Sequence, residues 1–144
     1  MKRTVRKAFT LVEILIVVVI LGILAAIVVP QFTNATQDAQ AGNIKAQLDT
    51  LNNQIELFKA RTNSYPTIAE LNLDSTNPSF AGKGWGPLID GGYVKAPPAN
   101  PFNGSSVVAA SATAGNGWHY DFTTGVLGAV NFDETTGKIT PTTP

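Results

Sequence analysis

The chain has 144 residues, no cysteine and a formal net charge of zero, with ten basic and ten acidic side chains. The missing cysteines exclude disulfide bonds and thiolate metal sites, and the length allows one compact domain with an appendage. Four basic residues precede Phe9, so the remainder keeps six basic (10 − 4) against ten acidic residues, a formal charge of −4. This balance does not favour a general nucleic-acid-binding surface.

The first element is a basic start, residues 1–8, followed by an apolar run, residues 9–29. In helical form these 21 residues span about 31 Å, close to the hydrocarbon thickness of a bilayer. A basic segment before an apolar one is typical of a secretory signal peptide or of an N-terminal anchor whose positive end stays in the cytoplasm.

Two details argue against a simple signal peptide. No small-residue cleavage site ends the apolar run, because Ala25 and Ala26 are followed by three more aliphatic residues. Glu13 also interrupts the run near its start, and an ionisable residue inside a membrane is a functional candidate that needs a partner. No basic residue follows Glu13 until Lys45, so we expect its partner to come from outside the anchor.

The segment from Lys7 to Glu13 reads Lys-Ala-Phe-Thr-Leu-Val-Glu and resembles the leader junction of type IV pilins and type II secretion pseudopilins. The resemblance implies that a prepilin peptidase cleaves between Ala8 and Phe9 and methylates the new Phe9 amine. It makes Glu13 the fifth residue of the mature chain. Ala8 stands where the family usually has glycine.

Cleavage would place a positive amine at Phe9, four residues from Glu13. In a filament, the Glu13 carboxylate of one subunit would pair with the Phe9 amine of its neighbour. Because the surroundings have a low dielectric constant, such a pair penalises a misplaced subunit and sets the register of assembly.

Gly22 and Pro30 match the family's helix-weakening positions. Proline in a helix interior removes an amide donor and costs about 3 kcal/mol, so Pro30 either ends the helix or kinks it. The following sequence favours a kink, because apolar residues recur at spacings of three and four as in an amphipathic helix: Ile44, Leu48, Leu51, Ile55 and Phe58. We therefore expect one bent helix over residues 9–61.

The region 62–105 is rich in turn and loop residues. A short helix is expected near Thr67, where Thr67 and Glu70 fit a capping box. Two segments, 58–67 and the proline-rich 92–102, are similar to major type II secretion pseudopilins.

Residues 106–144 are expected to form short antiparallel strands. Candidate strands cover 107–110, 117–122, 126–132 and 138–140, with turns between the last three. The expected fold is α+β, with a small antiparallel meander packed on a long kinked helix, as in the pilin fold. The expected segments are a leader (1–8), an assembly helix (9–30), an amphipathic helix (31–61), a loop-rich connection (62–105) and the sheet (106–144).

Few residues suggest chemistry. His119 is the only histidine and lies in a candidate strand, where a structural role is the simpler interpretation. The glycine-rich segment 82–86 lacks phosphate-loop spacing. Trp85 and Trp118 are expected in the core or at subunit contacts. Calcium is a candidate ion, since three acids lie near turns, but solvated turn acids are the simpler interpretation: Asp121, Asp133 and Glu134. No catalytic, cofactor-binding or metal-binding residue is assigned.

The leading hypothesis is a structural subunit and not an enzyme: a type II secretion pseudopilin that polymerises from the bacterial inner membrane. The resemblance implies membrane lipid, a prepilin peptidase, an inner-membrane assembly platform, minor pilins or pseudopilins and further copies of the chain as partners. It places the N-terminus in the cytoplasm and the C-terminal domain in the periplasm, before assembly into a periplasmic or surface filament. Two alternatives stay open: a type IV pilus subunit for adhesion, motility or DNA uptake, and an anchored periplasmic binding module that never polymerises.

Overall fold

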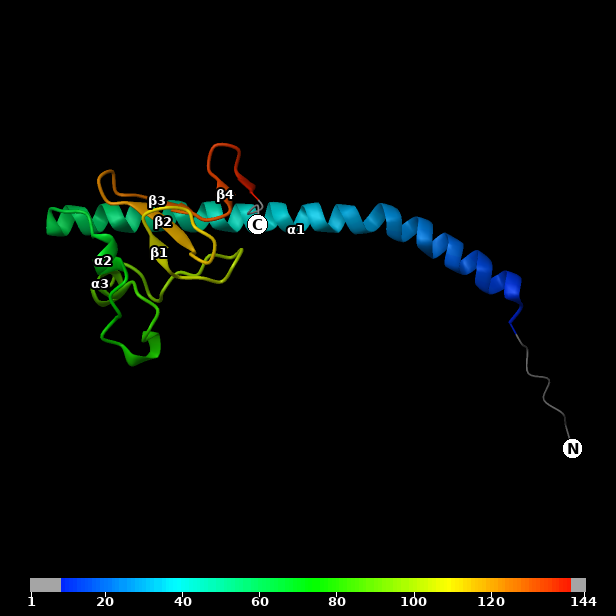
Figure 1. Ribbon diagram of the computed structural model, residues 1–144, viewed down its shortest axis with the longest axis horizontal. Coiled ribbons are helices and arrows are strands. Elements are labelled where there is room, and N and C mark those ends of the chain that lie inside the picture. The colour runs from blue at the N-terminus through cyan, green and yellow to red at the C-terminus, as the bar shows by residue number, and fades with distance from the viewer. Residues whose placement is uncertain (1–8, 141–144) are drawn as a thin grey trace, which may run out of the picture. The chain divides into compact units, whose positions relative to one another are not determined.

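The computed structural model describes residues 9–140, except for the side chains of residues 30–34. The contacts divide the chain into two units, residues 1–36 and 37–144, and each is described by itself. Helix α1, Leu11–Thr62, begins in the first unit and ends in the second. The helix expected over 9–61 is confirmed, and it continues through Pro30 (Figure 1). The kink stays a prediction.

The first unit contains no core of its own among its described side chains. Every residue from Phe9 to Val29 is exposed, and the large apolar side chains from Leu11 to Val29 are each at least 42% exposed. The stretch Leu11–Val29 has a mean hydropathy of 3.3, and its length and composition suit a membrane span. The segment must therefore be covered by lipid or by other protein.

The second unit has a core built on one face of α1. The expected seam is confirmed, since Ala41, Ile44, Leu48, Leu51 and Ile55 are buried and Phe58 packs beside them. A spacing of three and four residues places these side chains on one side of the helix, which the rest of the unit covers. The second part of α1 is therefore held by tertiary packing.

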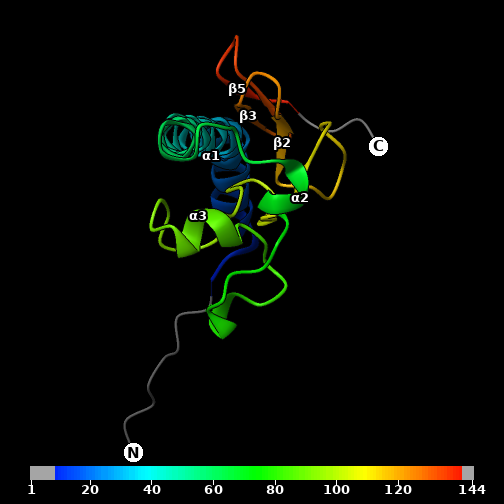
Figure 2. The ribbon, with the colours of Figure 1, turned by 90° about the vertical axis from the view of Figure 1, so that its left-hand side faces the viewer.

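Three short helices follow in the loop-rich region: α2 (Ile68–Leu71), the 3₁₀ helix η1 (Pro78–Phe80) and α3 (Gly86–Asp90). The capping box expected at α2 is confirmed. The Thr67 hydroxyl accepts the Glu70 N–H at 3.2 Å, and the Glu70 carboxylate accepts the Thr67 N–H at 2.7 Å. Within the second unit, Figure 2 shows α1 along its axis, with the sheet beside it and α3 below.

The strands are β1 (Val108–Ala109), β2 (Trp118–Asp121), β3 (Val126–Ala129), β4 (Phe132–Asp133) and β5 (Lys138–Ile139). They form a three-stranded sheet in the order β1-β2-β3 and a two-stranded sheet of β4 and β5. Antiparallel pairing is confirmed for β2 with β3 and for β4 with β5. The expectation of a wholly antiparallel sheet is wrong for β1, which runs parallel to β2 and makes the sheet mixed.

The strand expected over 126–132 is interrupted. Asn131 has a φ of 66°, in the left-handed region, which ends the extended course of β3 and turns the chain into β4. The hairpin β4–β5 therefore forms a separate sheet beside β3 and does not extend it.

Both tryptophans belong to the core, as expected, because Trp85 and Trp118 are fully buried. Each indole N–H has a backbone acceptor, the Ser106 carbonyl at 2.7 Å and the Pro98 carbonyl at 2.9 Å. Buried Asn100 ties the proline-rich segment to the sheet region, since its side-chain N–H group donates to the Gly117 and Val130 carbonyls at 2.7 and 3.1 Å. These bonds satisfy polar groups that would be costly to bury alone.

Candidate functional site

The first candidate site is the start of α1, where the predicted assembly residues lie. Phe9 is 80% exposed and begins a shallow apolar groove along one side of the helix. The groove is lined by Phe9, Thr10, Leu11, Ile14, Leu15 and Val18. None of the described residues of its own unit fills this groove, so the segment offers a surface to lipid or to a neighbouring helix.

Glu13 has a hydrogen-bond partner inside its own chain. One carboxylate oxygen, Oε2, accepts the Thr10 backbone N–H and the Thr10 hydroxyl, each at 2.8 Å, while the Thr10 hydroxyl accepts the Glu13 N–H at 3.3 Å. The expectation that a basic partner comes from outside the anchor is a separate matter and stays a prediction. Among the described residues Glu13 forms no ion pair, so a positive partner still has to come from elsewhere.

The other predicted N-terminal residues are placed only in part. Ala8 lies outside the described residues, so the cleavage position stays a prediction. Gly22 lies inside α1, where an added Cβ would meet no atom within 4 Å of the described chain. Gly22 therefore has no packing requirement within one subunit, and its role and that of Pro30 as weak points of the helix remain predictions.

His119 does not form a catalytic constellation in the described part of the chain. It lies on β2 opposite Gly128 of β3, and its ring and the Glu134 carboxylate occupy the space where a Gly128 side chain would be. Its Nδ1 is buried without a hydrogen-bond partner among the described residues. A general base of a nucleophile–base pair is normally oriented through such a bond, so the geometry gives His119 a packing role over Gly128.

The glycine-rich segment 82–86 is held by an acid and is not an open anion cradle. The Asp74 carboxylate accepts the Gly82 N–H at 2.8 Å and the Gly84 N–H at 3.1 Å. These backbone bonds, with Gly82 first, lower the pKa of Asp74 below its usual value. Amide groups that would bind a phosphate in a phosphate loop are thus already occupied by a carboxylate.

Two of the candidate calcium ligands stabilise their own turns. Asp121 accepts the Thr123 N–H at 2.8 Å, and this bond lowers its pKa. Asp133 accepts the Thr136 hydroxyl at 2.7 Å and the Thr135 N–H at 2.9 Å, which lower its pKa in turn. The part of the chain that the structure describes holds no group of three or more histidine, aspartate or glutamate side chains arranged to bind a metal. Calcium binding remains an untested expectation.

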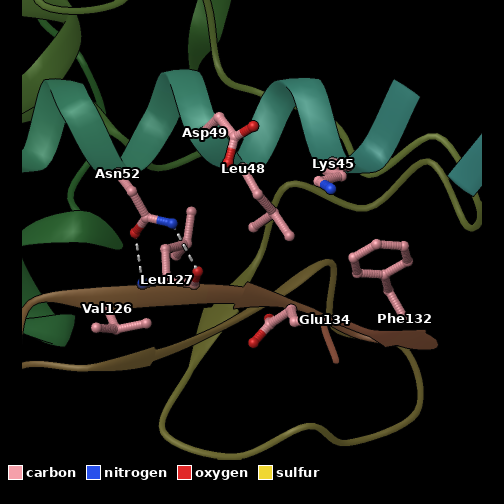
Figure 3. A pocket seen from close by; sticks show the side chains of 8 residues that line it. All are labelled: Lys45, Leu48, Asp49, Asn52, Val126, Leu127, Phe132 and Glu134. Atoms are coloured by element: carbon pink, nitrogen blue, oxygen red, sulfur yellow. Dashed lines mark hydrogen bonds between the residues drawn. The ribbon is translucent and has the colours of Figure 1, made fainter. Parts of the chain in front are cut away.

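A second candidate site, which sequence reasoning missed, is a cavity of about 220 Å³ in the second unit between α1 and the strands (Figure 3). Leu48 and Leu127 face each other across it, and charged side chains stand at its edges. Its lining residues come from α1 and from the segment β3–β5: Lys45, Leu48, Asp49, Asn52, Val126, Leu127, Phe132 and Glu134.

Asn52 fixes one wall of this cavity. Its side-chain carbonyl accepts the Leu127 N–H at 2.8 Å, and its side-chain N–H group donates to the Leu127 carbonyl at 3.1 Å (Figure 3). The side chain therefore pairs with β3 as a neighbouring strand would, and it saturates the sheet edge that faces α1. A sequence signal exists, because a polar residue lies directly beside the seam at Leu51, but the pattern does not show what it binds.

Comparisons with known proteins cover nearly the whole chain. The model of the prokaryotic N-terminal methylation motif matches residues 3–29, and the model of type II secretion system protein G matches residues 31–139. No solved structure matches.

Curated relatives agree with the family models. The type II secretion system core protein G of Aeromonas hydrophila is 35% identical over 103 residues, 71% of each chain. That of Pseudomonas aeruginosa is 32% identical over 120 residues, 80% of this chain and 81% of its own. The type IV narrow pilus major component PilA5 of Thermus thermophilus is 33% identical over 79 residues, 55% of this chain and 68% of its own.

The methylation motif covers the exposed apolar start of α1, and the protein G model covers the packed unit that follows, so both parts of the molecule agree with one assignment. The chain therefore belongs to the type II secretion system protein G family, the major pseudopilins.

Proposed function

We propose that this protein is the structural subunit of a type II secretion pseudopilus, a filament that polymerises from the inner membrane and drives protein export. The observation that carries the proposal is the joint occurrence, in one chain, of the methylation motif and of the protein G domain. Two relatives that match more than two thirds of this chain are core proteins of type II secretion systems.

The exposed start of α1 supports polymerisation on physical grounds. A stretch of 19 residues with no buried side chain presents far more contiguous apolar surface than a soluble monomer tolerates. Lipid covers this surface before assembly, and the helices of neighbouring copies cover it afterwards. The same segment thus serves first as the anchor and then as the filament core.

Processing supplies a positive partner for the Glu13 carboxylate. Cleavage between Ala8 and Phe9 by a prepilin peptidase creates a methylated amine at Phe9, which pairs with Glu13 of the adjacent copy. Thr10 remains in the mature chain, so its two hydrogen bonds to Glu13 hold the carboxylate in place while the subunit is single. Exchange of this local arrangement for the intersubunit pair would then select the correct register.

The remaining partners follow from the family. We propose a single-pass subunit with its N-terminus in the cytoplasm and residues 37–144 in the periplasm, extracted by an inner-membrane assembly platform together with minor pseudopilins. We propose no catalytic activity, because His119 has no orienting partner among the described residues and the glycine-rich segment is occupied by Asp74.

The test is the state of the chain in cells that carry a type II secretion system. Intact-mass measurement of the envelope protein should show loss of residues 1–8 and one added methyl group. Electron microscopy of sheared material from cells that overproduce the chain should show filaments with the same subunit mass. A full-length, unmethylated chain that stays monomeric in the membrane would overturn the proposal and favour an anchored binding module.

A type IV pilus subunit is the second candidate, favoured by the similarity to PilA5 over 79 residues. Deletion of the gene separates the two. Loss of an exported enzyme from the culture medium, with surface pili retained, supports the pseudopilin assignment. Retained export with loss of pili supports the pilus subunit.

A further inference from the structure

We propose that the cavity between α1 and the strands of one copy receives the Arg61 side chain of a second copy of this chain. This contact would join the globular units of neighbouring subunits, beyond the contact between their apolar segments. The inference rests on the proposed polymerisation and adds the site that positions the second unit.

The size and lining of the cavity suit one amphipathic side chain. Its volume of about 220 Å³ is below the roughly 300–1,000 Å³ of pockets that hold small ligands. Leu48, Leu127 and Phe132 provide apolar contact surface, while Asp49 and Glu134 bring carboxylates from the helix and from the hairpin. An arginine packs its aliphatic stem on such a surface and directs its charged head to the acids.

The two carboxylates at this cavity differ from the other acids of the second unit in their hydrogen bonding within the described part of the chain, although that of Glu134 also packs over Gly128 beside the His119 ring. Glu70, Asp74, Asp90, Asp121 and Asp133 all accept hydrogen bonds from other residues of the second unit. Glu56 accepts the Tyr65 hydroxyl at 2.7 Å. By contrast, Asp49 and Glu134 form no hydrogen bond or ion pair among the described residues, and with Lys45 they give the lining a formal charge of −1. The cavity thus attracts a cation.

Arg61 is the only arginine after the leader, and its exposed guanidinium is free to bind a carboxylate of another molecule. It is exposed, its guanidinium lies 5.4 Å from the centre of the Tyr93 ring, and it forms no ion pair among the described residues. The aromatic ring supports the side chain and leaves the charge available. A planar guanidinium can bind a carboxylate through two hydrogen bonds, which a lysine cannot reproduce.

Arg61 cannot fill the cavity of its own chain. It follows Asp49 by twelve residues on the same helix, so the two lie about 18 Å apart along the axis and about 120° apart around it. This distance exceeds the length of the side chain. The contact must therefore join two copies, with the donor and the acceptor on different sides of α1.

Such a contact is of the kind that builds a filament. Because the two surfaces differ, each copy offers an arginine to one neighbour and a cavity to another, and the contact forms an open filament when each copy is also displaced along the filament axis. Parallel copies displaced by about 18 Å along α1 bring the two surfaces level. The arrangement is compatible with the parallel apolar segments of the proposed filament.

Crosslinking in the assembled filament tests the contact. Because the chain has no cysteine, only the introduced thiols can react. A full-length chain with Arg61→Cys and Glu134→Cys would be treated with a short bis-maleimide, because two long side chains hold their Cα atoms farther apart than the roughly 7 Å limit of a disulfide. We expect a ladder of linked subunits. The matched control, Lys95→Cys with Glu134→Cys, replaces another exposed basic residue and should give monomers.

Reversal of the charges at the two positions provides a second test of the contact. Arg61→Glu should lower filament yield about tenfold, Glu134→Lys should do the same, and the two together should restore it to within about twofold. Tryptophan fluorescence of each variant checks that the second unit is folded. A ladder with the control pair and not with Arg61→Cys, or no rescue by charge exchange in folded variants, overturns the inference while the filament assignment stands. Absence of filaments from the unmodified chain removes the proposed function itself.

Discussion

The two units of this protein use the same helix in opposite ways. Between Leu11 and Val29, α1 is apolar on every side and buries no side chain within its own unit. From Ala41 to Ile55, the same helix is apolar along one seam, and that seam is buried under the sheet and the short helices. The apolar surface of the first part is left for its surroundings to cover, whereas that of the second part is covered by residues of its own chain.

This difference separates assembly from folding. A change in the first unit should alter insertion or polymerisation and leave the globular unit intact. A change at the seam should unfold the globular unit and leave the anchor in the membrane.

The largest effect is expected from Glu13. Glu13→Gln keeps the shape of the side chain and a hydrogen bond with Thr10, but removes the charge that, in the proposed filament, would pair with the Phe9 amine of the next copy. Loss of one partner from a buried ion pair costs about 3–5 kcal/mol, so filament yield should fall by well over tenfold.

Quantification of sheared filaments by immunoblot and microscopy measures this loss. Membrane insertion and cleavage should be unchanged, because the apolar run is intact. Ile20→Ala, in the same segment but uncharged, is the control. Filament yield from Glu13→Gln at the level of the unmodified chain would contradict the charge-pairing mechanism.

The next effect concerns the seam. Ile55 is fully buried, so Ile55→Ala should lower the free energy of unfolding of the second unit by about 2–5 kcal/mol through lost contacts and a cavity. Ile20 is 52% exposed, and Ile20→Ala should leave that free energy unchanged. Both tryptophans lie in the core of the second unit, so their fluorescence during denaturation in detergent reports this unit alone. Equal effects of the two changes would refute the separation of the units.

A smaller effect is expected at Asn52. Asn52→Ala leaves the Leu127 N–H and carbonyl without their partners at the edge of β3, which should cost about 1–3 kcal/mol. Asn53→Ala, at an exposed position next to it on α1, should be nearly neutral. Denaturant unfolding of the two variants, followed by tryptophan fluorescence, makes the comparison. A loss as large for Asn53→Ala would show that helix propensity, and not pairing with β3, determines the effect.

The smallest effect is the response to acid. Hydrogen bonds from Gly82 and Gly84 lower the pKa of Asp74, and the Ser75 hydroxyl lowers the pKa of Asp90. A carboxyl with a lower pKa in the folded state stabilises the fold fully above its unfolded pKa, about 3.9. That contribution disappears as the pH falls through the folded pKa.

Asp74→Asn should therefore lower stability at neutral pH and make the decline below about pH 4 shallower. Thermal unfolding at a series of pH values measures both quantities. Asp38→Asn, at an exposed position on α1, is the control and should leave the profile unchanged. A profile of Asp74→Asn parallel to that of the unmodified chain would show that the loop carboxyl does not contribute.

Local patterns in the sequence were sufficient for much of the fold. The seam from Ile44 to Phe58, the capping box at Thr67 and the turn between β2 and β3 each depend on residues close together in the chain. The leader motif likewise lies within a few residues, and the family comparisons bear out the methylation motif there. Features of this kind can be read from spacing, because helix and turn chemistry is local.

Apart from the local break at Asn131, the features that were missed are set by distant residues. The parallel pairing of β1 depends on a strand of two residues, too short for a pattern to show direction. The pairing of Asn52 with Leu127 joins residues 75 positions apart, and the cavity beside it is formed by segments equally remote. No spacing along the chain encodes such contacts.

The sequence alone therefore determined three features: an apolar N-terminal segment with one acid, an amphipathic helix with one apolar face, and several short segments that favour strands. These follow from hydropathy and periodicity, which depend only on residue order. Only the tertiary structure decided which polar groups are already satisfied and which remain available. Asp74, Asp121 and Asp133 accept hydrogen bonds from their own loops, whereas Asp49 and Glu134, beside a cavity, pair with no other residue in the described part of the chain. The physical reason is that a hydrogen bond depends on positions in space, which the folding of distant segments brings together.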